Sequence, residues 1–463
     1  MKVVLGSRKY HYMVRASISL ITAVLIWAMT GCTTVYPIEY KLTVSSTAGG
    51  SVVVPGEGTS AQLKGDRVTL SVKPDDGYRF VRWTGDVGTI GNVNRGSTTI
   101  KMGGDYSITA EFEKTPVYHL TVSVTGGGQV TIPGKGVFIY NDGKVVKLEA
   151  HEDIGWGFVS WTGDVGTIAD VDATSTNITM HGNYSITANF EEEAPVTITD
   201  TGLEAAIRAA RHITNRPLYP SDLKRLTSLD TDGENVSDLT GLEYCISLTR
   251  LFLSDNQIDD ISSLATLTRL TYLDLSGNQI DDISTVANLT RLTYLDLSGN
   301  RISDVSAVGN LLSLGELYLS RNQINDISAL VSLTGLRDLY LSHNRISDVS
   351  ALAPLTRLTE LYLSSNRISD VSALTSLTRL GDLSLADNQV DDISPLAGLS
   401  NLTLLNLSNN QISDIQPLVD NPGLSQGDRV YLYNNPLGYS PLIYISVSTH
   451  IAELEARGVI VEY

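Results

Sequence analysis

Aromatic residues and carboxylates recur at a fixed spacing through the second half of this 463-residue chain. They flank the first leucine of a Leu-x-Leu phrase that returns every 22 residues from Leu251 to Leu405. The position after that leucine, and the matching position of a final copy, hold Phe252, Asp274, Asp296, Tyr318, Tyr340, Tyr362, Ser384, Asn406 and Tyr431. The position before it holds Arg250, Tyr272, Tyr294, Glu316, Asp338, Glu360, Asp382, Leu404 and Arg429. Aromatic rings offer broad apolar contact and carboxylates offer charged acceptors, so the two columns suit binding.

The residue types that catalysis requires are not grouped in any recognisable way. The seven histidines are scattered, without the HExxH spacing of a zinc site. The phrase GxSxG occurs once, at 423–427, in the insertion between Asn410 and Asn435, and the chain has no phosphate-binding GxxxxGK loop. We therefore expect a protein that is not an enzyme and that needs no cofactor and no metal.

Aspartates at two kinds of position raise the question of cation binding. Asp86 and Asp164 lie in Gly-rich TGDVGT loops, and Asp pairs such as Asp259–Asp260 and Asp281–Asp282 follow the leucine phrases. Calcium prefers six to eight oxygen ligands, whereas each loop offers one carboxylate. Aspartates that accept hydrogen bonds from turn amides are the favoured interpretation at both positions.

Composition narrows the class of partner. The formal net charge is −18 and the sequence pI is about 4.7. This excess of acid argues against nucleic acid, whose phosphates need a basic face, and against direct docking on anionic lipid headgroups.

The N-terminal 31 residues have the features of an export signal. Basic residues precede an uncharged apolar stretch of 14 residues, 16–29, which is too short for a membrane span. The following MTGC resembles a bacterial lipobox, so residues 1–31 are predicted to be a lipoprotein signal peptide, Cys32 the lipidated residue and 32–37 a tether. The alternative is ordinary signal cleavage that leaves Cys32 as a free thiol. Because the C-terminal GVIVEY lacks a sorting signal, we expect anchorage at the N-terminus, on the outer side of the membrane.

The only other cysteine, Cys245, lies among apolar residues and is predicted to be buried rather than disulfide-bonded.

A long repeat occupies the region after the tether. YKLTV, WTGDVGTI and YSITAEF, which begin at Tyr40, Trp83 and Tyr106, each return 78 residues later with few changes. Short alternating runs separated by Gly and Pro predict small all-β modules at 38–114 and 116–192. Trp83 and Trp161 are expected in their cores.

A Pro-containing linker at 193–197 leads into a second kind of repeat. Thr201 and Glu204 have the spacing of a capping box before an amphipathic helix, so 198–240 is predicted to be an N-terminal cap with a degenerate first repeat. Asparagines then fall at intervals of 22 residues: Asn256, Asn278, Asn300, Asn322, Asn344, Asn366, Asn388 and Asn410. Together with the leucines they form the phrase LxxLxLxxNxI of a leucine-rich repeat, predicted for 241–435. Residues 436–463 are predicted to form a C-terminal cap, with Gly458 ending its helix.

These motifs resemble those of internalin-type bacterial surface proteins. The paired 78-residue modules, with their RFVRWTGD and GFVSWTGD segments, are similar to divergent B-repeats. The 22-residue period and its two ends resemble the leucine-rich-repeat domain of internalins. The resemblance implies that the β modules are stalks or spacers. It also implies that the asparagine amides bond backbone groups at the bend of each coil.

The expected fold is therefore multidomain: two all-β modules, then an α/β solenoid with a parallel sheet on its concave face and a cap at each end. Leucines alternate inward along each strand, so their neighbours face outward on the sheet. The candidate ligand-binding residues are Phe252, Tyr272, Asp274, Tyr294, Asp296, Tyr318, Tyr340, Tyr362, Asp338 and Glu360.

We expect a lipid-anchored surface adhesin whose concave face binds a protein. Two alternatives stay open: a carbohydrate or cell-wall binder, and a structural surface protein without a specific ligand.

Overall fold

The computed structural model describes residues 37–437 and 441–463. The predicted signal peptide and Cys32 lie outside the described residues. Two compact units divide the chain, Met1–Val117 and Tyr118–Tyr463, and the first β module belongs to the first unit.

The first β module consists of two small sheets that enclose one core. One sheet has the order β3-β1-β7-β5 and the other the order β2-β4-β6. Its strands are β1 (Glu39–Ser46), β2 (Gly50–Val54), β3 (Gly58–Leu63), β4 (Arg67–Pro74), β5 (Tyr78–Gly85), β6 (Ser97–Lys101) and β7 (Tyr106–Lys114). Alternation decides which side chains enter the core: Ile108, Ala110 and Phe112 of β7 are buried, and the residues between them are not.

The second module repeats this topology within the second unit. Its sheets have the orders β10-β8-β14-β12 and β13-β11-β9. The strands are β8 (Val117–Thr125), β9 (Gly128–Ile132), β10 (Gly136–Asn141), β11 (Val145–Glu152), β12 (Trp156–Gly163), β13 (Ser175–Thr179) and β14 (Tyr184–Glu192). Trp83 and Trp161 are each 1% exposed, and their indole N–H groups donate to the carbonyls of Arg95 and Ala173 at 3.1 Å. Both tryptophans are therefore core residues.

The N-terminal cap contains α1 (Thr201–Arg211), α2 (Pro220–Leu223) and β15 (Ser228–Asp230). The predicted capping box is wrong. Asp200, not Thr201, is the N-cap, and its carboxylate accepts from the backbone N–H of Leu203 at 3.0 Å. The same carboxylate accepts from the N–H of Ser237 at 2.8 Å, so a contact distant in sequence selects the cap, and Glu204 instead pairs with Arg208.

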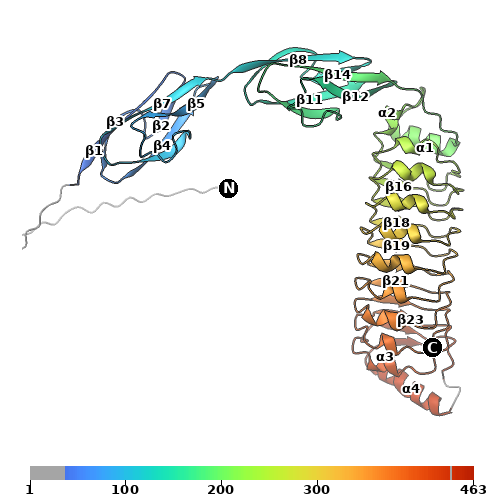
Figure 1. Cartoon of the computed structure of the whole chain (residues 1–463). Coiled ribbons are helices and arrows are strands. Elements are labelled where there is room, and N and C mark those ends of the chain that lie inside the picture. The colour runs from blue at the N-terminus through green and yellow to red at the C-terminus, as the bar shows by residue number, and fades with distance from the viewer. Residues whose placement is uncertain (1–36, 438–440) are drawn as a thin grey trace, which may run out of the picture. The chain divides into compact units, whose positions relative to one another are not determined.

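The remaining chain winds into coils, each with one short strand and, on the opposite side, one turn of 3-10 helix (Figure 1). Eleven parallel strands, β15 to β25 in chain order, form a single sheet. The strands after β15 are β16 (Arg250–Phe252), β17 (Tyr272–Asp274), β18 (Tyr294–Asp296), β19 (Glu316–Tyr318), β20 (Asp338–Tyr340), β21 (Glu360–Tyr362), β22 (Asp382–Ser384), β23 (Leu404–Asn406), β24 (Arg429–Tyr431) and β25 (Ile460–Glu462). The 3-10 helices are η1 (Leu242–Tyr244), η2 (Ser262–Thr266), η3 (Ser284–Asn288), η4 (Ser306–Asn310), η5 (Ser328–Ser332), η6 (Ser350–Leu352), η7 (Ser372–Ser376) and η8 (Ser394–Leu396).

One continuous hydrophobic core runs through all the coils. The leucines at the centre of successive strands are opposite one another in register, as Leu317 is to Leu339, and they are fully buried. Cys245 lies in this core, and burial raises the pKa of its thiol to about 12. The thiol is thus a small apolar filler in its protonated form.

The C-terminal end closes the core with α3 (Gln416–Asp420) and α4 (Pro441–Ala456), and Gly458 follows α4 with a φ of 88°. The chain then returns to the sheet as β25, which pairs with β24 through Ile460 and Arg429. The sequence did not predict this last strand. Among the described residues, none of the helices is both long enough and apolar enough to cross a membrane.

Candidate binding surface

A ladder of asparagine amides fixes the bend that follows each strand. Asn322 is typical: its Oδ1 accepts from the N–H of Ile302 in the preceding coil at 3.0 Å. Its Nδ2 donates to the carbonyls of Leu297 and Leu319 at 2.9 and 3.1 Å. Each amide thereby satisfies backbone groups that the bend leaves without partners, and it links two coils.

The same pattern is present at all eight asparagines that recur every 22 residues, and it extends to Asn435. Seven of the eight are buried, and Asn366 is half-buried. Asn421 is fully buried and donates to the carbonyls of Leu396 and Leu399 at 3.2 and 3.1 Å. It lies outside the repeat period, so no spacing in the sequence pointed to it.

The sheet places six aromatic rings in one unbroken row, which we call the aromatic ladder. Its members are Phe252, Tyr272, Tyr294, Tyr318, Tyr340 and Tyr362. Successive ring centroids are 4.1–5.3 Å apart. Two pairs are stacked with nearly parallel rings: Tyr272 and Tyr294 at 6°, and Tyr340 and Tyr362 at 12°. The spacing of neighbouring strands, ~4.8 Å, is what brings rings of adjacent coils into stacking contact.

Between β18 and β19 the aromatic residue moves from the position before the central leucine of the strand to the position after it. Tyr294 is the first residue of its strand and Tyr318 the last, yet their rings are 5.3 Å apart because they contact each other diagonally across the sheet. The carboxylates change position in the opposite direction. Asp274 and Asp296 follow the central leucine of their strands, whereas Glu316 and the carboxylates of the next strands precede it.

The carboxylates that border the ladder bond to their neighbours. Tyr318 Oη donates to Glu316 Oε2 at 3.3 Å, and Tyr340 Oη donates to the Glu360 carboxylate of the next strand. Asp274 and Asp296 accept from the N–H groups of Ser276 and Ser298 at 3.0 and 2.8 Å. The candidate residues on both sides of the exchange are half-buried, so each side chain is packed on one side and partly exposed on the other.

Burial and nearby charge shift the titration of this surface. Desolvation raises the pKa of Tyr294, Tyr318 and Tyr340, and the adjacent carboxylates raise it further. Desolvation also raises the pKa of Asp296, and the charge of Asp274 adds to that effect. The phenols therefore remain neutral donors, while the face as a whole carries negative charge.

Three residues outside the predicted set belong to this surface. Arg250 places its guanidinium carbon 5.2 Å from the ring centroid of Phe252 and 5.1 Å from that of Tyr272, a cation–π arrangement. Glu316 accepts from Tyr318, and Asp382 raises the pKa of Tyr362. All three residues directly precede the central leucine of their strands. This shared position is the feature of the sequence from which they could have been predicted.

The aspartates considered for cation binding accept hydrogen bonds instead. Asp86 and Asp164 accept from the N–H groups of Ser107 and Ser185, both at 2.8 Å. Asp260 and Asp282 accept from the N–H groups of Ser262 and Ser284, also at 2.8 Å. Within residues 37–437 and 441–463, no three His, Cys, Asp or Glu side chains are grouped so that they could hold a metal ion.

Comparison with known families separates the same two regions. A model described as the divergent InlB B-repeat domain matches residues 40–116 and 118–194. Models described as leucine-rich repeats match 246–288, 290–346, 334–376, 356–398 and 378–420. No curated protein sequence matches the chain.

Several solved structures are similar to the repeat region. Internalin C2 from Listeria monocytogenes is 38% identical over 46% of this chain and 98% of its own, with a TM-score of 0.45. The chain belongs to the internalin-type leucine-rich-repeat proteins.

Two other structures have lower identity. The internalin InlF from Listeria monocytogenes is 31% identical over 58% of this chain and 91% of its own, with a TM-score of 0.41. A leucine-rich-repeat protein from Leptospira interrogans is 26% identical over 53% of this chain and 62% of its own, with a TM-score of 0.47. In this internalin-type protein, the predicted order of B-repeat modules followed by a leucine-rich-repeat solenoid is confirmed.

Proposed function

We propose that this internalin-type protein is a surface-anchored adhesin whose aromatic ladder binds a protein partner. The observation that carries the proposal is the unbroken row of six rings on one face of the sheet, bordered by carboxylates. Aromatic residues are enriched at the energetic centres of protein interfaces. The internalin-type repeat supports an interaction role because neighbouring coils present one continuous surface.

The arrangement of the rings favours a protein over a glycan. A sugar that stacks on an aromatic residue needs a free ring face. In the ladder the ring faces of Tyr272 and Tyr294, and of Tyr340 and Tyr362, cover each other. What remains for a partner is a ridge of ring edges and phenol hydroxyls, which suits the mixed apolar and hydrogen-bonding surface of a protein.

Charge adds a requirement on the partner. Carboxylates follow the ladder along its length, from Asp274 to Asp382, and Arg250 lies at its N-terminal end. A partner with a basic or neutral patch satisfies this surface, and an acidic one is repelled.

Anchorage is proposed through a lipid on Cys32, and the outer side of the membrane is the proposed location. Support comes from the sequence alone: a basic segment, a short apolar stretch and the MTGC phrase. More than one acyl chain is needed for stable anchoring, which is the usual state of a lipobox cysteine. The two β modules between Cys32 and the solenoid are proposed to act as spacers.

Binding to extracts tests the proposal. Residues 33–463 would be immobilised and exposed to envelope and extracellular extracts, before and after treatment of the extracts with protease. We expect saturable binding that protease abolishes and that Tyr318/Tyr340/Tyr362→Ala weakens. The same column continues as Ser384 and Asn406, so the sheet accepts small side chains there.

Two outcomes would contradict the proposal. Binding that survives protease identifies a glycan, and binding that is indifferent to the triple substitution places the interface elsewhere. Tyr244/Tyr463→Ala serves as a matched control because both tyrosines are exposed, at 39% and 65%, and neither belongs to the ladder.

A further inference from the structure

The near-identical coils change abruptly along one edge of the sheet. The residues that lead into a strand follow the pattern Thr-Arg-Leu-Thr, as in 268–271, 290–293 and 356–359. Several coils depart from it, and of these 312–315 read Leu-Ser-Leu-Gly and 334–337 read Thr-Gly-Leu-Arg. Small residues replace an arginine at Ser313 and Gly335 and a threonine at Gly315.

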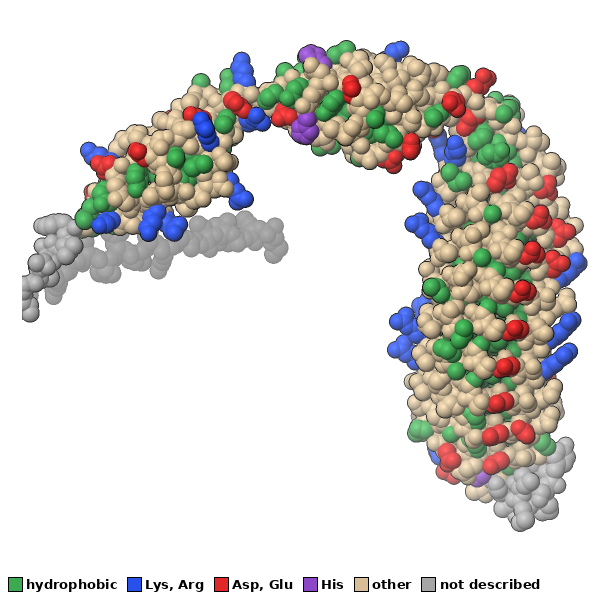
Figure 2. Space-filling view, viewed as in Figure 1, with side chains coloured by type: hydrophobic (Ala, Val, Ile, Leu, Met, Phe, Trp, Pro, Cys, Tyr) green, Lys and Arg blue, Asp and Glu red, His purple; other side chains and the backbone are tan. Residues whose placement is uncertain are grey.

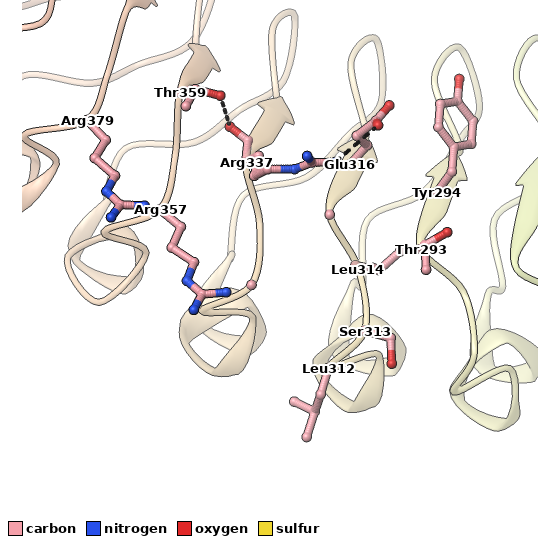
Figure 3. A pocket seen from close by; sticks show the side chains of 12 residues that line it. Thr293, Tyr294, Leu312, Ser313, Leu314, Glu316, Arg337, Arg357, Thr359 and Arg379 are labelled. Carbon is pink, nitrogen blue, oxygen red and sulfur yellow. Dashed lines mark hydrogen bonds and ion pairs between the residues drawn. The ribbon is translucent and has the colours of Figure 1, made fainter. Parts of the chain in front are cut away.

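These departures open a hollow of about 680 Å³ beside the starts of β18 to β21. The residues that matter for its chemistry are Leu312, Gly315, Gly335, Arg337, Arg357 and Arg379. Figure 3 shows the guanidinium groups of Arg357 and Arg379 extending toward the coil before their own, and that of Arg337 directed to Glu316. The volume is within the range of sites that hold small ligands or peptide side chains.

The hollow exists because Gly315 has no side chain. A Cβ at this position would lie 3.4 Å from Nη2 of Arg337, so the guanidinium lies over the glycine. In the coil before, Thr293 fills the same space and donates from Oγ1 to the carbonyl of Thr271 at 3.0 Å. Thr359 makes the matching bond to the carbonyl of Arg337 at 3.2 Å.

The hollow combines positive charge with apolar surface. Arg337, Arg357 and Arg379 are all exposed. Arg337 meets Glu316 only at 3.7 Å, with 62% of its side chain exposed. Leu312 is 65% exposed at a position where most other coils have threonine or serine and the first has Ile246. Figure 2 shows basic side chains along both edges of the coils of a protein whose net charge is −18.

We propose that this hollow is a second binding site, which takes an acidic peptide segment with an apolar side chain next to its carboxylates. Guanidinium groups match carboxylates with paired hydrogen bonds, and three of them from successive coils suit several carboxylates in a row. Leu312 supplies the contact for the apolar side chain. The site adjoins the aromatic ladder, since Tyr294 and Glu316 also line the hollow, but its arginines give it the opposite charge, and it does not depend on the function proposed for the ladder.

Fluorescence anisotropy with a defined probe tests this site. The probe is a labelled dodecapeptide of alternating Glu and Leu, titrated with residues 33–463 at low and moderate salt. We expect saturable binding that weakens with salt and that Arg337/Arg357/Arg379→Gln weakens about tenfold, the sum of three modest exposed ion pairs. Gly315→Thr should weaken it roughly threefold by filling the hollow, without lowering the unfolding midpoint.

Matched controls separate a built site from general charge attraction. Arg301/Arg345/Arg367→Gln removes the same charge from exposed residues that follow the strands instead of preceding them. This control and Tyr318/Tyr340/Tyr362→Ala should leave the affinity within about twofold. The proposal is wrong if the two arginine triples weaken binding equally, or if Gly315→Thr has no effect.

Competition identifies the class of ligand. A peptide with Gln in place of Glu should fail to compete, and a peptide with Ser in place of Leu should compete poorly. Polyphosphate or polygalacturonate that displaces the probe as well as the unlabelled acidic peptide does would overturn the assignment to a peptide.

Discussion

The two kinds of repeat in this chain bury their hydrophobic side chains in different ways. Each β module closes on itself, with its own core around Trp83 or Trp161. A coil of the solenoid cannot close. Its leucines are covered by those of its neighbours, and its bend is bonded by its own asparagine and by that of the next coil.

The comparison explains where binding surfaces arise. A closed module buries the tryptophan at its centre, and its repetition adds a second separate core. An open coil stacks in register, so a side chain that faces outward in one coil adjoins its counterpart in the next. Repetition then produces the aromatic ladder, and a local break in repetition produces the hollow at Gly315. Damage should accordingly remain local in a module and spread in the solenoid.

The largest expected effect is the loss of a module core. Trp83→Ala removes the central side chain and its bond to Arg95, and we expect about 3–5 kcal/mol of destabilisation confined to the first module. The four tryptophans are Trp27, Trp83, Trp156 and Trp161, so tryptophan fluorescence of residues 33–463 reports on the modules alone. Far-UV circular dichroism follows the solenoid.

The matched change in the second module is Trp161→Ala, which should shift a different part of the fluorescence transition. If Trp83→Ala lowered the midpoint of the solenoid as well, the closed nature of the first module would be refuted.

A smaller effect is expected from breaking one rung of the asparagine ladder. Asn322→Ala leaves the N–H of Ile302 without its partner and removes one of the two amide donors to the carbonyl of Leu297, at a cost of about 1–3 kcal/mol. Because that rung joins two coils, the whole solenoid transition should move and become less cooperative, as urea denaturation followed by circular dichroism would measure. Asn325→Ala, an exposed asparagine three residues on, should change the midpoint little.

Two aspartates of the solenoid should contribute to the pH dependence of its stability with opposite signs. Asp296 has a raised pKa, so the stability that its protonated form provides is lost as pH rises through the folded-state value. Asp296→Asn should therefore stabilise the protein at pH 7, and the gain should fade below about pH 4.

Asp282 provides the opposite case, because hydrogen bonds from the N–H and hydroxyl of Ser284 lower its pKa. Its contribution is present at neutral pH and is lost as pH falls through the folded-state value, so Asp282→Asn should not stabilise at pH 7. Denaturation midpoints from pH 3 to 8 compare the two variants. If the midpoints of the two variants changed with pH in the same way, the expected difference between aspartates on the sheet face and aspartates in the turns would be wrong.

The smallest effect is expected from a substitution that restores the residue found at the same position in other coils. Gly315→Thr should stabilise the solenoid by about 0.4–1 kcal/mol, since the threonine restricts the unfolded chain and can repeat the bond that Thr293 makes. Gly335→Thr is the contrast, because its Cβ would lie 3.3 Å from the carbonyl of Leu314. A thermal melt in which Gly315→Thr lowers the midpoint would show that the hollow is required for folding.

The sequence by itself determined most of the architecture. A strict 22-residue period of leucines and asparagines admits one solution, in which strands stack in parallel with leucines inside and the Asn amide at each bend. The 78-residue repeat, with alternating strands around one tryptophan, likewise determined two β modules. These features are local in sequence and are multiplied by repetition, so a pattern suffices to predict them.

Only the tertiary structure decided the features that depend on contacts between distant residues. Asp200 is the N-cap of α1 because its carboxylate also reaches Ser237, and the last strand exists because Val459 and its neighbours bring the chain back to β24. The ladder passes diagonally from Tyr294 to Tyr318, and the hollow lies where Gly315 of one coil meets Arg337 of the next. Each depends on distances across coils, which the order of residues along the chain does not contain.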